Sequence, residues 1–160
     1  MVQTDDVPEP PVIPRSSLFV ELRQSLASRV EDISPFVNQL MEFITPLSGG
    51  FRCKEGPVVD VEISLCEAVA NAVLHGNHEN PQKRVYVTCH CSTDGELSLT
   101  IRDEGQGFDP FALPDPTDQR NILLTHGRGI LLMQALMDEV NFEENGTVVR
   151  MRKRLRGTVE

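Results

Sequence analysis

The stretch Glu67-Ala-Val-Ala-Asn71-Ala-Val-Leu-His75-Gly76 decides how this sequence is interpreted. Glu67, Asn71 and His75 recur at every fourth position, so they share one face of the helix that the stretch predicts. That face lies within or beside an apolar stripe, where a carboxylate and an amide need partners. For the helix alone two interpretations stay open: a capping or interhelical hydrogen bond, or a polar binding site.

The predicted helix begins near Pro57 and runs to about residue 74. Apolar residues recur along it at helical spacing and form a stripe that faces the core. This stripe consists of Val61, Leu65, Val69, Ala72 and Val73. Gly76 fits the C′ position that follows a helix, because glycine adopts the left-handed conformation without a steric penalty.

A hairpin and a glycine-containing turn follow the helix. Alternating apolar residues predict strands over 85–91 and 97–101, joined by the turn signal Asp94-Gly95. The second strand runs directly into the segment 103–108, Asp-Glu-Gly-Gln-Gly-Phe. Glycines two positions apart indicate a turn pressed against something flat or bulky, although an ordinary turn has the same pattern.

Residues 109–126 show no periodic pattern, and a loop of this length inside a domain is usually functional. Gly127-Arg128-Gly129 then opens a helix that is predicted to run to about Met137. The unpaired amides and the dipole at such a helix start favour an anion such as phosphate. The pattern is neither a Walker A loop nor a Rossmann fingerprint.

Three further elements complete the expected domain, which spans 16–160 behind a disordered, proline-rich arm at 1–15. A strand is predicted over 18–28 and a helix over 30–45, in which Pro35 either kinks the helix or marks its first turn. A final hairpin is predicted around Asn145-Gly146, with strands over 140–143 and 147–155. Arg150, Arg152, Arg154 and Arg156 share one face of the last strand, which is either a solvated sheet face or a docking face for an acidic partner.

Composition limits the classes of function. The chain has 160 residues and a net charge of −9, which argues against direct binding to nucleic acid. No apolar run approaches the roughly 20 residues of a membrane span, and no signal peptide is expected. None of the four cysteines forms a CxxC pair, so no zinc ribbon is expected and a reducing, cytoplasmic location is favoured.

Together, the order and spacing of these motifs resemble the Bergerat-fold ATPases, the GHKL superfamily that includes gyrase and the histidine kinases. The resemblance covers residues 20–156. It is strongest to the anti-sigma-factor serine/threonine kinases, through the stretch at 67–76 and through Gly127-Arg-Gly-Ile-Leu-Leu-Met-Gln-Ala-Leu-Met-Asp138-Glu-Val. It implies an α/β (α+β) two-layer sandwich, with a mixed, mostly antiparallel sheet and helices on one face.

The resemblance also implies a role for individual residues in binding ATP and Mg²⁺. Asn71 matches the ligand of Mg²⁺, and Glu67 matches the general base that accepts a proton from the acceptor. Asp103 matches the residue that accepts a hydrogen bond from the exocyclic amine of adenine, and Thr147 matches the hydroxyl that supports it. The rest of the implied ATP site consists of His75, Gly105, Gly107, Gly127, Arg128 and Gly129.

Residues 109–126 match the lid that closes over the phosphates of ATP. Thr125 and His126 stand where some relatives carry a lid arginine. Arg120 or Arg128 is therefore a candidate for contacting the γ-phosphate, and the sequence does not choose between them.

The implied function is that of an anti-sigma factor and serine kinase, which sequesters a sigma factor and phosphorylates a STAS-type antagonist protein. A homodimer is left open. The alternative is an ATP-binding regulatory module of the same fold without efficient phosphoryl transfer, and a third hypothesis is a hydrolytic ATPase subunit of a larger machine. Glu67 favours catalysis, because binding alone does not need a base at this position.

Overall fold

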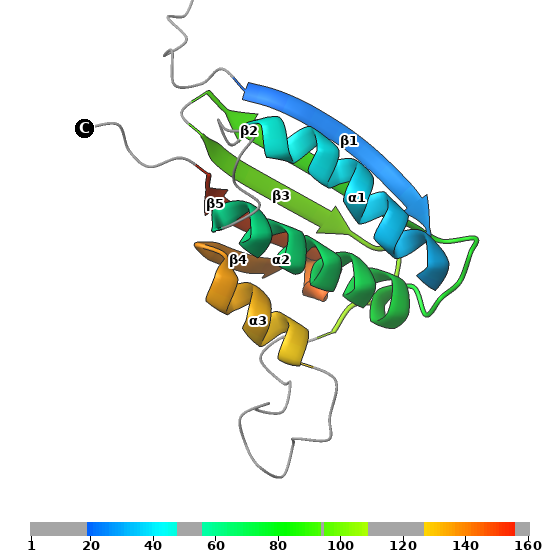
Figure 1. The fold of residues 1–160 in the computed structure, drawn as a ribbon. Coiled ribbons are helices and arrows are strands. Elements are labelled where there is room, and N and C mark those ends of the chain that lie inside the picture. The colour runs from blue at the N-terminus through cyan, green and yellow to red at the C-terminus, as the bar shows by residue number, and fades with distance from the viewer. Residues whose placement is uncertain (1–18, 48–55, 94, 109–126, 156–160) are drawn as a thin grey trace, which may run out of the picture.

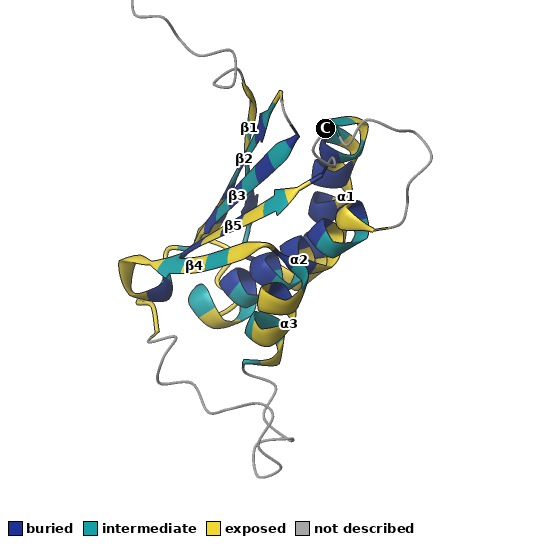
Figure 2. Ribbon diagram, turned by 90° about the vertical axis from the view of Figure 1, so that its left-hand side faces the viewer, coloured by how far each residue is buried: buried dark blue, intermediate teal, exposed yellow. Residues whose placement is uncertain are grey.

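The computed structural model describes residues 19–47, 56–93, 95–108 and 127–155. Among these residues, a five-stranded sheet carries the α-helices on one face, and no described helix covers the other face (Figures 1 and 2). The predicted α+β two-layer sandwich with helices on one face is therefore confirmed. The arm at 1–15 and the loop at 109–126 lie outside the described residues.

The sheet has the order β1-β2-β3-β5-β4. Its strands are β1 (Phe19–Ala27), β2 (Arg84–Ser92), β3 (Glu96–Arg102), β4 (Glu139–Glu143) and β5 (Val148–Arg154). All four pairings between these strands are antiparallel, so the parallel component expected for a mixed sheet is not found among the described residues. The reason is topological. β3 and β4 run in the same direction, but β5 returns between them and pairs with both.

Three α-helices cover the inner face: α1 (Val30–Leu47), α2 (Pro57–Asn71) and α3 (Arg128–Leu136). α1 begins at Val30 and contains Pro35, so the expectation that Pro35 marks its first turn is wrong. Proline cannot donate to the carbonyl four residues earlier. The helix continues through it because α1 buries an apolar face on both sides of the proline, with Ile33 before it and Phe36 after it.

α2 continues past Asn71 as a π-helical turn over Ala72–Gly76. The main-chain N–H of Asn77 donates to the carbonyl of Ala72 at 2.8 Å, which closes this wider turn. Gly76 does not have a positive φ, so its predicted role as a left-handed C′ residue is wrong. A glycine is needed at position 76 because a Cβ atom there would collide with the carboxylate of Asp103.

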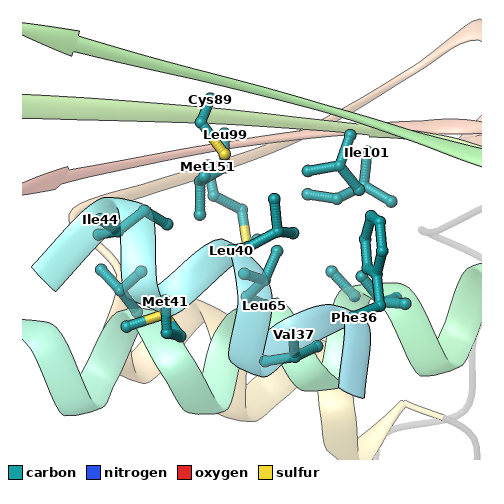
Figure 3. Close-up of a cluster of buried hydrophobic side chains, with 14 of the residues drawn as sticks. Phe36, Val37, Leu40, Met41, Ile44, Leu65, Cys89, Leu99, Ile101 and Met151 are labelled. Atoms are coloured by element: carbon teal, nitrogen blue, oxygen red, sulfur yellow. The ribbon is translucent and has the colours of Figure 1, made fainter. Parts of the chain in front are cut away.

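The core lies between the helices and the sheet (Figure 3). Leu40 and Ile44 of α1 and Leu65 of α2 are completely buried, and they face Leu99 and Met151 of the sheet. Each buried side chain of this size stabilises the fold by roughly 1.5–3 kcal/mol. The predicted stripe at 61–73 is confirmed, because all five of its residues are buried. α2 therefore belongs to the core along one face while it carries Glu67 and Asn71.

The outer face of β5 bears the arginines that the sequence placed together. Each described arginine of this face pairs with glutamates of β3 or β4. These pairs are Arg150 with Glu143, Arg152 with Glu96 and Glu139, and Arg154 with Glu96. Arg102 of the neighbouring β3 pairs in the same way with Glu144. Exposed pairs of this kind contribute little individually, roughly 0–1 kcal/mol. They favour the solvated sheet face over a docking face for an acidic partner, and Arg156 lies outside the described residues.

Candidate functional site

A cavity of about 140 Å³ lies between the end of α2, the turn after β3, the start of α3 and the sheet. Much of its lining is apolar and comes from Ala68, Ala72, Ile101, Ile130, Met133, Phe142 and Val149. Four polar side chains line it as well: Asn71, His75, Asp103 and Thr147. An apolar slot with a few polar groups suits a flat ligand that is recognised at its edge.

Asp103 is a half-buried carboxylate that lines this cavity. Its main-chain N–H donates to the carbonyl of Thr147 at 3.0 Å, and its Oδ1 accepts from the N–H of Gly105 at 2.8 Å. Its Oδ2 accepts no hydrogen bond from the described residues. Burial raises the pKa of this carboxyl, and the hydrogen bond from Gly105 opposes that rise. The arrangement leaves one carboxylate oxygen able to accept from a ligand.

The glycines around Asp103 are explained by close packing within the protein. A side chain at Gly76 would collide with the Asp103 carboxylate, and one at Gly105 would collide with the carbonyl of Gly76. Gly107 has a φ of 80° and lies against the carbonyl of Asn145. Gly105 and Gly107 therefore lie in a turn that packs against the main chain of residues 76 and 145. Their closeness to a nucleotide base stays a prediction.

Glu67 and Asn71 lie together at the start of α3. A Cβ atom added to Gly129 would be 2.5 Å from Oε2 of Glu67 and 3.4 Å from Nδ2 of Asn71. A residue larger than glycine at 129 would therefore push the carboxylate away. The helix spacing that suggested a shared face is confirmed, and the third helix supplies the polar main chain that faces it.

Gly127 caps α3 in the left-handed conformation, with a φ of 89°, so a glycine is required there. The first N–H groups of α3 have no partner within the helix and point away from its N-terminus, which favours an anion. Arg128 is exposed at this helix start. Gly127 lines the cavity, whereas Arg128, Gly129, Glu67 and Gly105 are not among its lining residues.

Thr147 and His75 complete the predicted set at the cavity wall. The hydroxyl of Thr147 donates to the carbonyl of Glu144 at 2.8 Å, so its oxygen can still accept a hydrogen bond. His75 is exposed in the π-helical turn and lines the cavity. The three predicted lid residues Arg120, Thr125 and His126 lie outside the described residues.

The motifs did not identify the aromatic pair that closes one side of the cavity. The rings of Phe108 and Phe142 meet edge to face, with centroids 5.8 Å apart. The main-chain N–H of Phe108 donates to the carbonyl of Asn145 at 2.7 Å, which joins the two turns. The alternation of β4 would have placed Phe142 on the inner face, but it could not show that Phe108 reaches the same cavity.

Comparison with known proteins identifies the family. The histidine kinase-like ATPase domain matches residues 30–153 of the chain. The anti-sigma F factor of Heyndrickxia coagulans is 33% identical over 129 residues, covering 77% of this chain and 80% of that protein. The anti-sigma F factor of Bacillus subtilis is 30% identical over 143 residues, with coverage of 83% and 82%.

Two further matches agree with these. The serine-protein kinase RsbW of Staphylococcus epidermidis is 34% identical over 117 residues, covering 67% of this chain and 74% of that protein. The crystal structure of the RsbU and RsbW domains of Rv1364c from Mycobacterium tuberculosis shares the fold, with a TM-score of 0.56 at 17% identity; the match covers 84% of this chain and 31% of that longer one. The chain thus belongs to the histidine kinase-like ATPase family, in the branch that contains the anti-sigma F factors and the serine-protein kinase RsbW.

Proposed function

We propose that this chain is an ATP-dependent serine kinase and anti-sigma factor, which holds a sigma factor and phosphorylates a serine of a STAS-type antagonist. The names of its relatives support this role. The single observation that carries it is the placement of the Glu67 carboxylate against Gly129, at the start of α3 and beside the cavity that Asp103 lines.

The part of the cavity next to Asp103 fits the adenine of ATP. The base would lie between the apolar residues, and its exocyclic amine would donate to Oδ2 of Asp103. The ionised carboxylate is the form that accepts without competing as a donor. Thr147 lies at the same edge, where its hydroxyl oxygen would accept directly or through a water.

The part next to Asn71 and the start of α3 fits the phosphates and Mg²⁺. No group of three or more His, Cys, Asp or Glu side chains among the described residues could hold a metal ion by itself. Asn71 supplies one hard oxygen, so phosphate oxygens and waters would complete the shell that Mg²⁺ prefers. When bound, the ion would neutralise charge on the phosphates. The N–H groups at the start of α3 would hold phosphate oxygens from the protein side.

Glu67 is the proposed general base. It would accept the hydroxyl proton of the acceptor serine as the serine oxygen bonds to the γ-phosphorus and ADP leaves. The position of Glu67 between two helices limits its movement, so the carboxylate is held ready for the approaching hydroxyl. The added phosphate would then change the charge at the antagonist's interface and release it from the complex.

Replacement of Glu67 by Gln tests the proposal against the ATP-binding module without efficient transfer. We expect Glu67→Gln to abolish phosphorylation of the antagonist, with a loss of at least about 100-fold, and to leave the affinity for ATP within about threefold. Glu62→Gln, an exposed change on the same helix, is the matched control and should keep full activity. An unchanged rate in Glu67→Gln would refute the base.

The metal assignment and the partners are tested separately. Asn71→Ala should remove the Mg²⁺-dependent part of the ATP affinity, measured by titration calorimetry with and without Mg²⁺. A pull-down from a native cytoplasmic lysate with Mg·ATP should recover a sigma factor and a small STAS protein carrying phosphoserine. The mass of the purified chain in solution, from light scattering, decides whether it forms the homodimer.

None of the described helices is both long and apolar enough to cross a membrane.

A further inference from the structure

Asn77 is a buried amide outside the proposed ATP-binding set. Its side chain is 1% exposed, and each of its polar atoms has a partner. Its Nδ2 donates to Oγ of Ser28 at 2.8 Å and to the carbonyl of Arg84 at 2.9 Å. Its Oδ1 accepts from the main-chain N–H of Glu104 at 2.8 Å. A buried side chain with this many bonds fixes the segments that it joins.

These bonds join four parts of the chain, of which those at residues 28 and 104 are distant from Asn77 in sequence. Asn77 directly follows the π-helical turn at the end of α2, and Ser28 directly follows β1. Ser28 in turn donates to the carbonyl of Lys83 at 2.9 Å, just before β2. Glu104 belongs to the turn after β3. Asn77 therefore ties the end of α2 to the turn that carries Asp103.

The side chain of Glu104 holds the turn as well. The carboxylate of Glu104 accepts from the N–H of Arg84 at 2.6 Å and from the hydroxyl of Tyr86 at 3.3 Å. Because Gly76 lies directly against the Asp103 carboxylate, a shift of the helix end relative to the turn would move that carboxylate. Only the bond from Asn77 to Glu104 joins these two segments through a side chain among the described residues.

We infer that Asn77 is a positioning residue that aims the Asp103 carboxylate at the exocyclic amine of adenine and so gives the pocket its preference for adenine over guanine nucleotides. The inference rests on the proposed function of Asp103. Adenine presents an amine where guanine presents a carbonyl oxygen, and a fixed carboxylate accepts from the first and repels the second. A carboxylate that moves loses part of this discrimination, because selectivity depends on a polar group held in place.

The experiment compares affinities for ATP and GTP in the full chain. We expect Asn77→Ala to lower the ratio of ATP to GTP affinity by about tenfold, which corresponds to one well-placed hydrogen bond. Ser28→Ala is the matched control, since it removes a partner of Asn77 but leaves the bond to Glu104. Its ratio should stay within about twofold of the wild type, even if its unfolding temperature falls.

The outcomes separate this inference from the proposed function. If the wild type does not prefer ATP, or Asp103→Asn keeps the preference, then the proposed adenine contact fails. If Asp103→Asn loses the preference and folded Asn77→Ala keeps it, then Asn77 is only structural and the inference is overturned.

If Asn77→Ala does not fold, hydrogen exchange in the wild type tests the positioning role of Asn77. ATP should slow the exchange of the Glu104 amide by at least about threefold more than GTP does, because only adenine would hold the turn against Asn77. Equal protection by both nucleotides would overturn the inference.

Discussion

The two ends of α2 are anchored by polar residues of different kinds. Asn77, just beyond the C-terminal end, is a neutral amide that is 1% exposed and bonded to two main-chain groups and a hydroxyl. Lys153 of β5 lies against the N-terminal end, where its Nζ is 3.0 Å from Oδ2 of Asp60 and 3.7 Å from Oδ1 of Asp138. The same ammonium donates to the carbonyl of Leu136 at the end of α3.

The difference shows what burial requires of each group. An amide is satisfied by hydrogen bonds alone and can be buried completely. An ammonium also needs opposite charge and contact with water, and the Lys153 side chain keeps 14% of its surface exposed. The neutral anchor stands beside the turn that carries Asp103, where an extra charge would disturb that carboxylate. The charged anchor stands at the far end of the helix.

The largest effect is expected from placing a charge in the neutral anchor. Asn77→Asp should destabilise the protein by about 3–5 kcal/mol at pH 8, because a buried carboxylate would face the carbonyl of Arg84 without a counter-charge. Burial would raise the pKa of that carboxyl above its unfolded value, so the deficit shrinks as the pH falls and the group is protonated. Urea unfolding at pH 8 and pH 5 measures the loss of stability and its dependence on pH. The substitution Asn80→Asp at an exposed position is the control. A deficit independent of pH would contradict this explanation.

Removal of the charged anchor should have a smaller effect. Lys153→Met should lower the free energy of unfolding by about 1–3 kcal/mol, because the carbonyl of Leu136 and the carboxylate of Asp60 lose their shared donor. Lys153→Arg keeps the charge and should recover most of the loss. Urea unfolding of the three proteins checks the difference. A Lys153→Met protein as stable as the wild type would show that solvation replaces the anchor.

The stability that each anchor contributes should depend differently on salt concentration. Raising the salt concentration from about 0.05 M to about 0.5 M shortens the range of charge interactions. The difference in the free energy of unfolding between wild type and Lys153→Met should therefore shrink by roughly 0.5 kcal/mol. The corresponding difference between wild type and Asn77→Ala should stay constant. Equal salt dependence in both variants would remove the distinction between a charged and a neutral anchor.

The smallest change in stability is expected at Asp103, beside the neutral anchor. Burial raises the pKa of this carboxyl, so the stability that it contributes is present at acidic pH and is lost as the pH rises through the folded-state pKa. Asp103→Asn keeps an acceptor for the N–H of Gly105. Its unfolding temperature at pH 7 should rise slightly, while its affinity for ATP falls. A lower unfolding temperature would mean that the negative charge has a structural role.

The sequence predicted most of the elements because their apolar residues follow the periods of helices and strands. It also predicted that Glu67 and Asn71 share a face, since spacing alone determines this on a helix. The order of the strands could not be predicted, because the pairing of β5 with both β3 and β4 depends on contacts distant in sequence. The π-helical turn was missed for a similar reason, since neither Gly76 nor its neighbours signal a wider turn.

The two anchors differ in how well the sequence predicts them. Lys153 shares the alternation of Val149, Met151 and Leu155, so the sequence predicts its place on the face of the last strand opposite the arginines. Asn77 follows a histidine and a glycine at a helix end, where polar residues are common. Its partners are contributed by residues 28, 84 and 104, and no local pattern connects these positions.

The wider turn over Ala72–Gly76 also affects how this chain tolerates a change in length. Five residues of this wider turn cover about the same rotation as four residues of an α-helix, so deleting one residue there would leave the later positions pointing in about the same directions. Glu67 and Asn71 precede the deletion and would also keep their directions. A descendant that lost this residue would keep its core, its base and the group that holds the turn after β3.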